Sequence, residues 1–511
     1  MHPDPTRPGT GYLAGMSQAP TSLPPALPPT RPIRFVHRGQ VVEVADVAPT
    51  TSVLTWLREH ARCTGTKEGC NEGDCGACTV LVGQLQPAGQ VGWTPVNSCI
   101  QFLPTLDGRA LLTVEDLGGH HPAQQALVAC HGSQCGFCTP GFVMSLAACR
   151  ARHAQSPGRA QIADDLSGNL CRCTGYRPIL DAGERMFEAS APPLGDAGTA
   201  DALRTLAADS ALHYAASAAF HAPRTLPDLA ALRAAKPQAT LLAGSTDIGL
   251  WVNKQFRDLG EVIWLGAVPA LQAITVADGV LTIGAGASLE AAWAALATHW
   301  PACRDMGRRF ASRPVREAGT MGGNVANGSP IGDSAPVLIA LGASIVLRRG
   351  ESLRMLSLQD FYLGYMRNQL QPGEFVEAIT VPLPQPGAGE VLRVEKLSKR
   401  FDCDISGLSA GLWLKRDGAT VVDARFAFGG LDAIVRRAAG AEAAVRGQPW
   451  TAATVQAAMA ALDADFTPLS DLRASAGYRR RAARALLQRL WLASRPDVPL
   501  AEAQLSVWSG A

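Results

Sequence analysis

Apolar and polar residues alternate in short runs near the beginning of the chain, which is typical of strands with one buried face. Residues 34–44 follow this pattern on both sides of Gly39, so we expect two strands joined by a tight turn. From 52 to 58 the apolar positions take the spacing of an amphipathic helix. This order, followed by a cysteine-rich loop, predicts a small α+β domain over 33–118.

The pattern changes at about residue 119, where alanine becomes frequent and apolar residues recur at helical spacing. We expect helices at 124–129 and 142–154 and no strand, hence an all-helical domain over 119–190. The segment 191–212 begins with prolines and glycines, and we interpret it as a linker.

The second half of the chain predicts two more units in which strands and helices are combined. The first covers 213–385 and ends at a proline-rich break, and the second covers 390–505. The basic run 478–484 is interpreted as the solvated face of a helix. The expected strands lie at 240–243, 262–265, 280–283, 344–347, 391–396, 410–415 and 424–428.

Composition agrees with several packed domains and excludes some classes of protein. The chain has 511 residues, of which 47% are hydrophobic and 18% charged, which suits roughly three to four folded domains. The net charge of +2 argues against a protein built to neutralise nucleic-acid phosphates. No apolar run of about 18 residues is free of charge, Gly and Pro, so we expect no membrane span.

The first 32 residues hold nine prolines and no apolar run long enough for a secretory signal. We expect residues 1–32 to form a disordered extension, and Met16 is as plausible a start as Met1. The absence of an export signal predicts a cytoplasmic protein.

The thirteen cysteines are unevenly distributed. Eleven lie between Cys63 and Cys173, whereas Cys303 and Cys403 stand apart. A secreted disulfide scaffold would be short and rich in cysteine throughout. Metal ligation in a reducing compartment explains this distribution better.

The first set of cysteines has the spacing C-x4-C-x2-C, followed by one more cysteine. It comprises Cys70, Cys75, Cys78 and Cys99. This is the ligand spacing of a plant-type [2Fe–2S] cluster, and nearby glycines allow a short loop to fold around it. A structural zinc site is the alternative, but zinc sites usually carry two C-x2-C-like pairs. Cys63 lies outside the spacing and is expected in the core.

The second set combines a C-x2-C pair with a C-x-C pair. It comprises Cys135, Cys138, Cys171 and Cys173. Four thiolates at this spacing suit either a [2Fe–2S] cluster or a zinc ion. Cys130 and Cys149 do not fit this set and are expected to behave as small apolar residues.

Three long segments around these cysteines resemble the cluster motifs of the molybdenum hydroxylase family. They cover 69–80 for the first set, and 131–141 and 168–179 for the second. The resemblance implies that all eight cysteines bind iron–sulfur clusters. It implies one [2Fe–2S] cluster in a plant-type ferredoxin-like β-grasp domain and another in the all-helical domain.

Two glycine-rich turns, at 241–249 and 316–324, are candidates to present backbone N–H groups to a pyrophosphate. The chain lacks G-x-G-x-x-G after a strand and lacks G-x4-G-K-[ST], so a Rossmann domain and a P-loop are disfavoured. Read alone, the turns are better explained as plain connections, because glycine turns more often have that role. They resemble the FAD-binding loops of the same family, in a domain similar to the vanillyl-alcohol-oxidase type of FAD fold. A C-terminal α+β flavoprotein domain would follow.

The resemblance also implies which residues contact FAD. Phe310 would lie beside the isoalloxazine ring, Asp333 would bind a polar part of the cofactor, and Lys396 would lie near the pyrimidine edge. Taken singly, these residues read as a core Phe, a turn Asp and a surface Lys. The full set is Leu241, Leu242, Ala243, Gly244, Ser245, Thr246, Asp247, Ile248, Phe310, Thr320, Met321, Gly322, Gly323, Asn324, Asp333, Val376 and Lys396.

The segment 396–406 resembles the family's loop over the flavin, and we interpret Cys403 within it as incidental. The order of domains resembles the small subunit of bacterial two-subunit xanthine dehydrogenases. This implies a molybdopterin-binding large subunit as partner, in a heterotetramer of two small and two large subunits. Electrons from oxidation of hypoxanthine and xanthine to urate would pass from the partner's molybdenum to the helical-domain cluster. They would then pass to the ferredoxin-like cluster, FAD and NAD+, and the resemblance assigns no catalytic residue to this chain.

Three other functions are compatible with parts of this pattern. The same architecture would serve a molybdenum hydroxylase acting on aldehydes or N-heterocycles. A stand-alone electron-transfer flavoprotein would not need the helical cluster domain. A zinc-bound interaction scaffold would be colourless, whereas iron–sulfur clusters and flavin absorb visible light.

Overall fold

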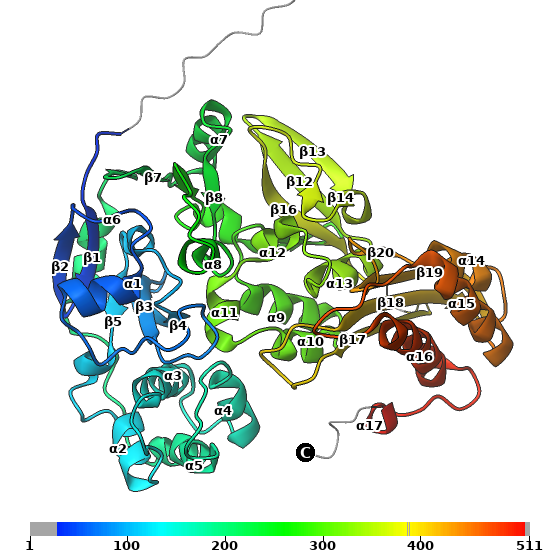
Figure 1. The fold of residues 1–511 in the computed structure, drawn as a ribbon, viewed down its shortest axis with the longest axis horizontal. Helices are drawn as coiled ribbons and strands as arrows, with labels where there is room; N and C mark the ends of the chain where they lie inside the picture. Colours follow the sequence, from blue (N-terminus) through cyan, green and yellow to red (C-terminus); the bar gives the residue numbers. More distant parts are fainter. Residues whose placement is uncertain (1–27, 386, 388, 506–511) are drawn as a thin grey trace, which may run out of the picture.

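The computed structural model describes residues 28–385, 387 and 389–505. The chain runs from a sheet at the left of Figure 1, through a helical group below it and a central region, to a second sheet-and-helix unit at the right. The described residues form four sheets of four or five strands and one two-stranded ribbon. The predicted multidomain α+β class is therefore confirmed.

The N-terminal sheet has the strand order β2-β1-β5-β3-β4. Strands β1 and β2 form the predicted hairpin, in which Arg38 and Gly39 both have positive φ (54° and 69°), as a two-residue turn of this type requires. Strand β1 pairs with β5 in parallel, and β3 pairs with β4 and β5 antiparallel. The strands are β1 Ile33–His37, β2 Gln40–Val44, β3 Thr79–Leu85, β4 Val91–Asn97 and β5 Ala110–Leu112; helix α1 covers Val53–Thr55 and continues as a wider turn over Trp56–His60.

A group of helices without strands follows, drawn in teal at the lower left of Figure 1. Phe142, Leu146 and Cys149 line the buried side of α3 and pack against Ile162 and Ile179 of neighbouring helices. The helices are α2 Pro122–Ala129, α3 Thr139–Arg152, α4 Arg159–Asp165 and α5 Arg177–Arg185.

Parts of two segments that were predicted to be unstructured contact the folded domains. The predicted linker contains helix α6, Thr199–Ala207, whose Leu203 and Leu206 are buried against strand β1. Its apolar positions are three residues apart, so they form one helical face, which the preceding prolines obscured. Of the predicted disordered extension, 1–27 lies outside the described residues. Arg31, however, forms an ion pair with Asp107 at 2.7 Å and is fixed by it.

The central region contains two sheets. The first has the order β6-β7-β9-β8 and the second, entirely antiparallel, the order β10-β11-β16-β12-β13. The strands are β6 Leu212–Ala215, β7 Ala219–Ala222, β8 Thr240–Leu242, β9 Val262–Trp264, β10 Ile274–Ala277, β11 Val280–Gly284, β12 Ser344–Arg349, β13 Ser352–Ser357 and β16 Phe375–Pro382, with the ribbon β14 Tyr362–Gly364 and β15 Arg367–Asn368. The helices are α7 Leu226–Ala235, α8 Ile248–Asn253, α9 Leu289–His299, α10 Cys303–Arg309, α11 Arg313–Ala318, α12 Met321–Asn327 and α13 Ser334–Ala340.

The C-terminal unit is a four-stranded sheet, β17-β18-β19-β20, covered by helices. The basic run on α16 is not wholly solvated, because Arg479 is buried and its guanidinium donates to the Gly407 carbonyl oxygen at 2.9 Å. The elements are β17 Glu390–Leu397, β18 Leu408–Asp417, β19 Thr420–Gly429, β20 Arg436–Arg437, α14 Ala439–Val445, α15 Ala452–Asp465, α16 Ala476–Ser494 and α17 Glu502–Leu505. Among the described helices, none is both long and apolar enough to cross a membrane.

Candidate iron–sulfur and flavin sites

The first cysteine set lies on the loop before β3 and just after β4. Positive φ angles at Asn71, Gly73 and Gly76 (56°, 79° and 69°) turn this loop back on itself. The backbone N–H groups of Asp74 and Cys75 donate to the Cys70 sulfur, both at 3.3 Å. The loop therefore points amide hydrogens at sulfur, as a cluster-binding loop does.

The sulfurs of this set interact two by two, in three pairs. Cys70 lies within hydrogen-bonding distance of Cys75 and Cys99, and Cys99 also contacts Cys78. Contact with these thiols lowers the pKa of Cys70 and raises the pKa of Cys99. Cys78 and Cys99 are buried, while Cys70 and Cys75 are half-buried.

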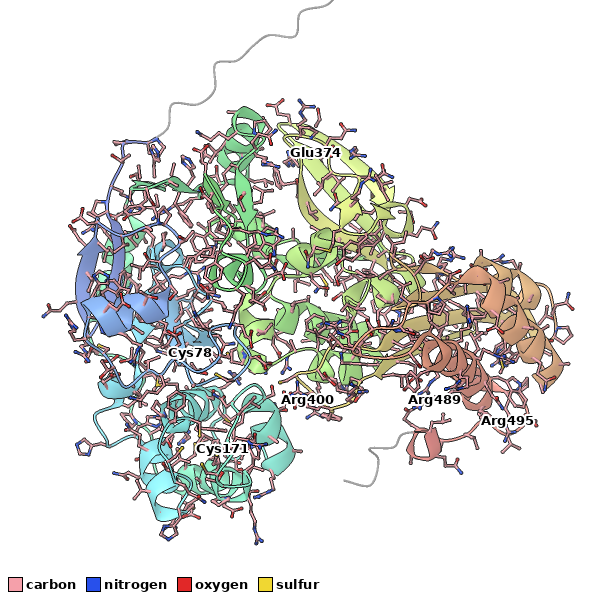
Figure 2. All side chains as sticks on the ribbon, in the orientation of Figure 1. Cys78, Cys171, Glu374, Arg400, Arg489 and Arg495 are labelled. Atoms are coloured by element: carbon pink, nitrogen blue, oxygen red, sulfur yellow. The ribbon has the colours of Figure 1, made fainter. Side chains whose placement is uncertain are left out.

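The second set is assembled at the start of α3 and on the loop that follows α4. Cys135 contacts Cys173, and Cys138 contacts Cys171. Burial and the Cys171 contact raise the pKa of Cys138 to about 12. Cys135 and Cys173 are exposed to solvent. Figure 2 labels one cysteine of each set, Cys78 and Cys171.

The arrangement of the sulfurs fits a cluster with two irons better than one zinc ion. Because Zn–S bonds are ~2.3 Å long, a tetrahedral zinc site needs all its sulfurs within about 4 Å of one another. Neither set brings three thiols within 4.8 Å of each other. Among the described residues, the ligand atoms of Cys149, His153 and Asp165 do lie this close together, but they belong to neither set. Thiols in pairs suit two irons with two cysteines each.

The first glycine-rich turn joins β8 to α8. Gly244 packs so closely on α11 that an added Cβ would lie 2.0 Å from the Ala318 carbonyl oxygen. The next residue, Ser245, has a positive φ of 64° and is buried. The N–H groups of Ser245, Thr246 and Asp247 have no acceptor among the described residues. This turn can therefore offer its backbone donors to a ligand.

The second turn, at the start of α12, differs from the prediction. The N–H groups of Met321 and Gly322 donate to the carbonyl oxygens of Ala287 and Ala285, both at 3.0 Å. The Thr320 hydroxyl accepts the N–H of Gly323 at 3.1 Å, as a helix N-cap. Because these donors are already used within the protein, this turn offers a ligand mainly the exposed surface of Gly323 and the side-chain amide of Asn324.

A buried ion pair lies at the position where the sequence predicted two separate cofactor contacts. Lys396 Nζ donates to Asp333 Oδ2 at 2.6 Å and to Ser406 Oγ at 2.8 Å, and Ser406 Oγ donates to Asp333 Oδ1 at 2.6 Å. Lys396 and Asp333 are only 4% and 6% exposed, so Lys396 is not a surface lysine. A buried ammonium is stable only when an opposite charge and hydrogen-bond acceptors compensate it, as Asp333 and Ser406 do here.

Other close approaches join these parts into one region. An added Cβ on Gly319 would lie 3.3 Å from Thr246 Oγ1, and one on Gly332 would lie 3.9 Å from Asn324 Oδ1. Next to Phe310, the Ala311 carbonyl oxygen accepts the N–H of Cys403 at 3.3 Å, which places the predicted flavin loop against α10.

The apolar members of the predicted set lie in two cores. Phe310, Met321 and Val376 are buried in the core around α9 and β16, and Phe310 packs on Trp293 with ring centres 6.2 Å apart. Leu242 is buried beside the N-terminal sheet, with the half-buried Ile248 packed there. Leu241 and Ala243 pack against the core of α7.

Unpartnered polar atoms show that this region suits a polar ligand. The hydroxyl oxygens of Ser245, Ser334 and Ser409 are buried without a hydrogen-bond partner among the described residues. Such groups cost free energy unless a ligand or water satisfies them. Two of them directly follow predicted contacts, Gly244 and Asp333, so the residues present fit a large polar cofactor.

Four known protein families match consecutive parts of the chain. The "2Fe-2S iron-sulfur cluster binding domain" matches 35–100, and the "[2Fe-2S] binding domain" matches 113–184. The "FAD binding domain in molybdopterin dehydrogenase" matches 214–384, and the "CO dehydrogenase flavoprotein C-terminal domain" matches 393–494. The chain is an iron–sulfur flavoprotein of the molybdenum hydroxylase family. These matches confirm the predicted order of a ferredoxin-like, a helical iron–sulfur, an FAD and a C-terminal flavoprotein domain.

The curated relatives of this molybdenum hydroxylase chain are much longer proteins. Xanthine dehydrogenase of Emericella nidulans is 31% identical over 85% of this chain and 36% of its own length. Xanthine dehydrogenase 2 of Arabidopsis thaliana is 29% identical over 81% of this chain, and aldehyde oxidase 4 of Cavia porcellus is 29% identical over 83%, each with 36% of its own length matched. The chain spans about a third of these relatives.

Two solved structures are similar in fold to part of the molybdenum hydroxylase chain. One is carbon monoxide dehydrogenase from Hydrogenophaga pseudoflava, which lacks the Mo-pyranopterin moiety of its molybdenum cofactor; it is 28% identical with a TM-score of 0.50. The other is reconstituted CO dehydrogenase from Oligotropha carboxidovorans, 27% identical with a TM-score of 0.50. Each match covers 53% of this chain and 94% of the other.

Several residues that join the cysteine sets and the flavin region to one another were not predicted from the sequence. Ser406 completes the Asp333–Lys396 pair, and it stood within the loop assigned to the flavin. Asn253 Nδ2 donates to the Cys99 carbonyl oxygen at 2.8 Å and so joins α8 to the first cysteine set. The only sequence signal for Asn253 was its polar side chain one helical turn beyond the first glycine-rich turn. Its partner, Cys99, is too distant in sequence for this contact to be predicted.

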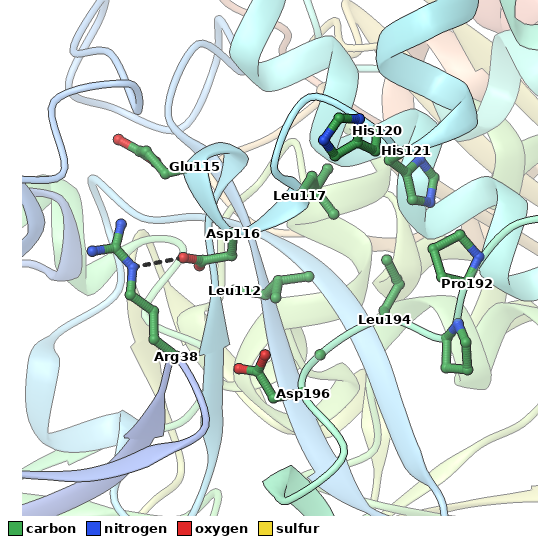
Figure 3. A pocket seen from close by; sticks show the side chains of 12 residues that line it. Arg38, Leu112, Glu115, Asp116, Leu117, His120, His121, Pro192, Leu194 and Asp196 are labelled. Atoms are coloured by element: carbon green, nitrogen blue, oxygen red, sulfur yellow. Dashed lines mark hydrogen bonds and ion pairs between the residues drawn. The ribbon is translucent and has the colours of Figure 1, made fainter.

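A separate cavity of about 430 Å³ lies away from these sites, between the N-terminal sheet and the segment before α6. Figure 3 shows its wall, where Arg38 pairs with Asp116 at 2.8 Å and His120 and His121 stand near Leu117. It contains none of the predicted cluster or flavin residues.

Proposed function

We propose that this chain is the electron-transfer subunit of a xanthine dehydrogenase. The observation that carries the proposal is a continuous line of contacts between the sites. Leu170, next to Cys171, donates its N–H to the Cys75 carbonyl oxygen at 3.0 Å. Asn253, at the end of the helix that follows the first glycine-rich turn, donates to the Cys99 carbonyl oxygen at 2.8 Å. The second set, the first set and the flavin turn are thus consecutive.

The proposal assigns one [2Fe–2S] cluster to each set of four cysteines. When bound, the clusters supply one-electron transfer and FAD supplies the step between one and two electrons. The chain's own residues hold the sulfurs in pairs, donate N–H groups to the Cys70 sulfur and bury Cys78 and Cys99 away from water.

The proposed partner is a molybdopterin-binding large subunit, in a heterotetramer of two small and two large subunits. The exposure of Cys135 and Cys173 supports entry of electrons at the second set, because that set faces solvent. Exposed apolar side chains gather on the same loops, at Phe137 and Tyr176. An exposed apolar surface of this kind favours a protein partner.

The proposed flavin site consists of the seventeen residues given above, with Lys396 as its cation. The Lys396 ammonium is held by Asp333 and Ser406, and can stabilise negative charge that develops on a bound ring. Ser245 and the free N–H groups beside it would bind polar atoms of FAD. NAD+ is the proposed final acceptor.

Xanthine is the proposed substrate of the assembly because curated relatives with that activity in their names match most of this chain. An aldehyde-oxidising hydroxylase is the second candidate, supported by the match to aldehyde oxidase 4. The residues that choose between these substrates would lie on the partner.

The test is purification of the tagged chain from its native host. We expect about four irons and one FAD per chain, a co-purifying large subunit with molybdenum, and NADH formation with xanthine. Aldehyde oxidation without xanthine activity would select the second candidate. Stoichiometric zinc in place of iron, or a pure chain without a molybdenum partner, would refute the proposal.

A further inference from the structure

The two cysteine loops meet backbone to backbone. Besides the Leu170–Cys75 hydrogen bond, glycines remove the side chains that would separate the loops. A Cβ on Gly76 would lie 2.3 Å from the Gly168 carbonyl oxygen, and one on Gly141 would lie 2.1 Å from the Gly76 carbonyl oxygen. The loops therefore cannot take any side chain at these positions without moving apart.

One side chain, Asn169, fixes this contact. It is 3% exposed and lies two residues before Cys171. Its Nδ2 donates to the Gly76 carbonyl oxygen at 3.0 Å and to Thr79 Oγ1 at 3.2 Å. Its Oδ1 accepts from Ser145 Oγ, on helix α3, at 2.6 Å. Asn169 thus joins the loop of Cys75 and Cys78, the loop of Cys171, and the helix that begins after Cys138.

We infer that Asn169 is a positioning residue that sets the spacing and orientation of the two clusters and thereby the rate of electron exchange between them. The inference rests on the proposed function, since it requires a [2Fe–2S] cluster in each set. In the exchange, one cluster loses one electron and the other gains it, and no bond forms or breaks. Groups around metal ligands orient them, and removing such groups commonly costs 10- to 100-fold in function.

A purely structural role for Asn169 predicts something different. Asn97 is equally buried, at 2% exposure, and its Nδ2 donates to the Gly73 carbonyl oxygen at 2.8 Å. Asn97 therefore supports the first loop alone and does not reach the second set. The matched variant Asn97→Ala removes a buried amide beside the same cysteine loop without touching the contact between the loops.

The experiment compares Asn169→Ala and Asn97→Ala in the full chain loaded with both clusters and FAD. Iron, labile sulfide and FAD are counted first. EPR of the fully reduced protein then measures the magnetic interaction between the two paramagnetic clusters, which depends on their separation and orientation. Rapid-freeze EPR after a pulse of a one-electron radical reductant measures the rate of exchange between them.

We expect Asn169→Ala to keep about four irons, to change the inter-cluster magnetic interaction and to slow exchange roughly 10-fold or more. Asn97→Ala is expected to leave both properties unchanged. An Asn169→Ala protein with wild-type interaction and rate would overturn the inference. So would an equal change in both variants.

If Asn169→Ala loses a cluster, the same measurements on Asn169→Asp test the inference instead. Aspartate keeps the side-chain volume of asparagine, but its carboxylate cannot donate to the Gly76 carbonyl oxygen. A wild-type rate in that variant again contradicts the inference, and a slowed rate supports it. Failure of the proposed function would look different, because the unmodified chain would then lack two clusters by iron count and EPR.

Discussion

At the scale of single residues, the Lys396 ammonium is the cation of the proposed flavin site. It is surrounded by protein and compensated by the Asp333 carboxylate and the Ser406 hydroxyl. An ammonium group has three N–H donors, and two of them donate to Asp333 and Ser406. The third is available for a bound cofactor. A preorganised cation of this kind binds negative charge without reorganising at the moment of reaction.

We therefore expect Lys396→Met to weaken FAD binding roughly tenfold or more, since a hydrogen bond from a charged group contributes about 1.5–3 kcal/mol. The measurement is fluorescence titration of the FAD-depleted chain with FAD. Lys399→Met is the matched control, because Lys399 lies in the same loop but is exposed and donates to the Leu472 carbonyl oxygen. Equal FAD affinities in both variants would contradict the assignment of Lys396.

At the scale of elements, helix α2 begins with an unusual cap. His121 is buried, and its Nδ1 accepts the N–H of Ala123 at 3.2 Å, while Gln124 Oε1 accepts the N–H of His121 at 3.3 Å. An imidazole nitrogen can accept only while it is unprotonated. Burial, together with the nearby Arg150, lowers the pKa of His121 to about 4. The cap therefore connects the stability of this helix to pH.

The sign of this effect follows from linkage. Between the ordinary value of 6.5 and about 4, the unfolded chain binds a proton at His121 and the folded chain does not. The contribution of the neutral His121 to the free energy of unfolding is fully present above pH 6.5. It is lost as the pH falls toward 4. We expect the thermal midpoint to fall over this window and the fall to be smaller in His121→Asn, which keeps a capping side chain. His120→Asn, at an exposed neighbour, should keep the wild-type slope; an unchanged slope in His121→Asn would refute the effect.

At the scale of the whole molecule, the helical iron–sulfur group is joined to the flavin region by buried charges. Arg316 of α11 is 1% exposed and pairs with Asp164 of α4 at 3.1 Å and with Glu290 of α9 at 2.6 Å. Beside it, Arg313 pairs with Glu290 at 2.8 Å and lies 3.6 Å from Asp165. The same Arg316 guanidinium donates to the Phe310 carbonyl oxygen at 3.3 Å. One residue thus links the second cluster's domain to the flavin side.

Removal of this guanidinium leaves the Asp164 carboxylate without its ion-pair partner, whereas Glu290 keeps Arg313. We expect Arg316→Gln to destabilise the molecule by about 3 kcal/mol, the usual cost of breaking a buried ion pair. The measurement is thermal unfolding followed by calorimetry, with Arg480→Gln, at an exposed arginine of α16, as control. If Arg316→Gln unfolds at the temperature of the control, the network does not hold the domains together.

The sequence by itself determined the features that are local along the chain. The spacing of Cys70, Cys75 and Cys78 predicts a loop whose turning points are glycines, because only a few φ and ψ values let so short a loop return on itself. The hairpin at Gly39 and most of the predicted strands are also local features, because a few adjacent residues and the alternation of apolar and polar positions are enough to predict them.

Tertiary structure alone decided the partners that are far apart in sequence. Nothing local distinguishes Lys396 as buried, links Ser406 to Asp333, or places Asn169 against Gly76, because a side chain's burial and hydrogen bonds depend on which elements pack against it. Helix α6 was missed because the preceding prolines obscured its helical spacing, and only the packing of Leu203 and Leu206 against strand β1 shows which face is buried. Short-range sterics and periodicity act within a few residues, whereas charge compensation and close packing act across the folded molecule.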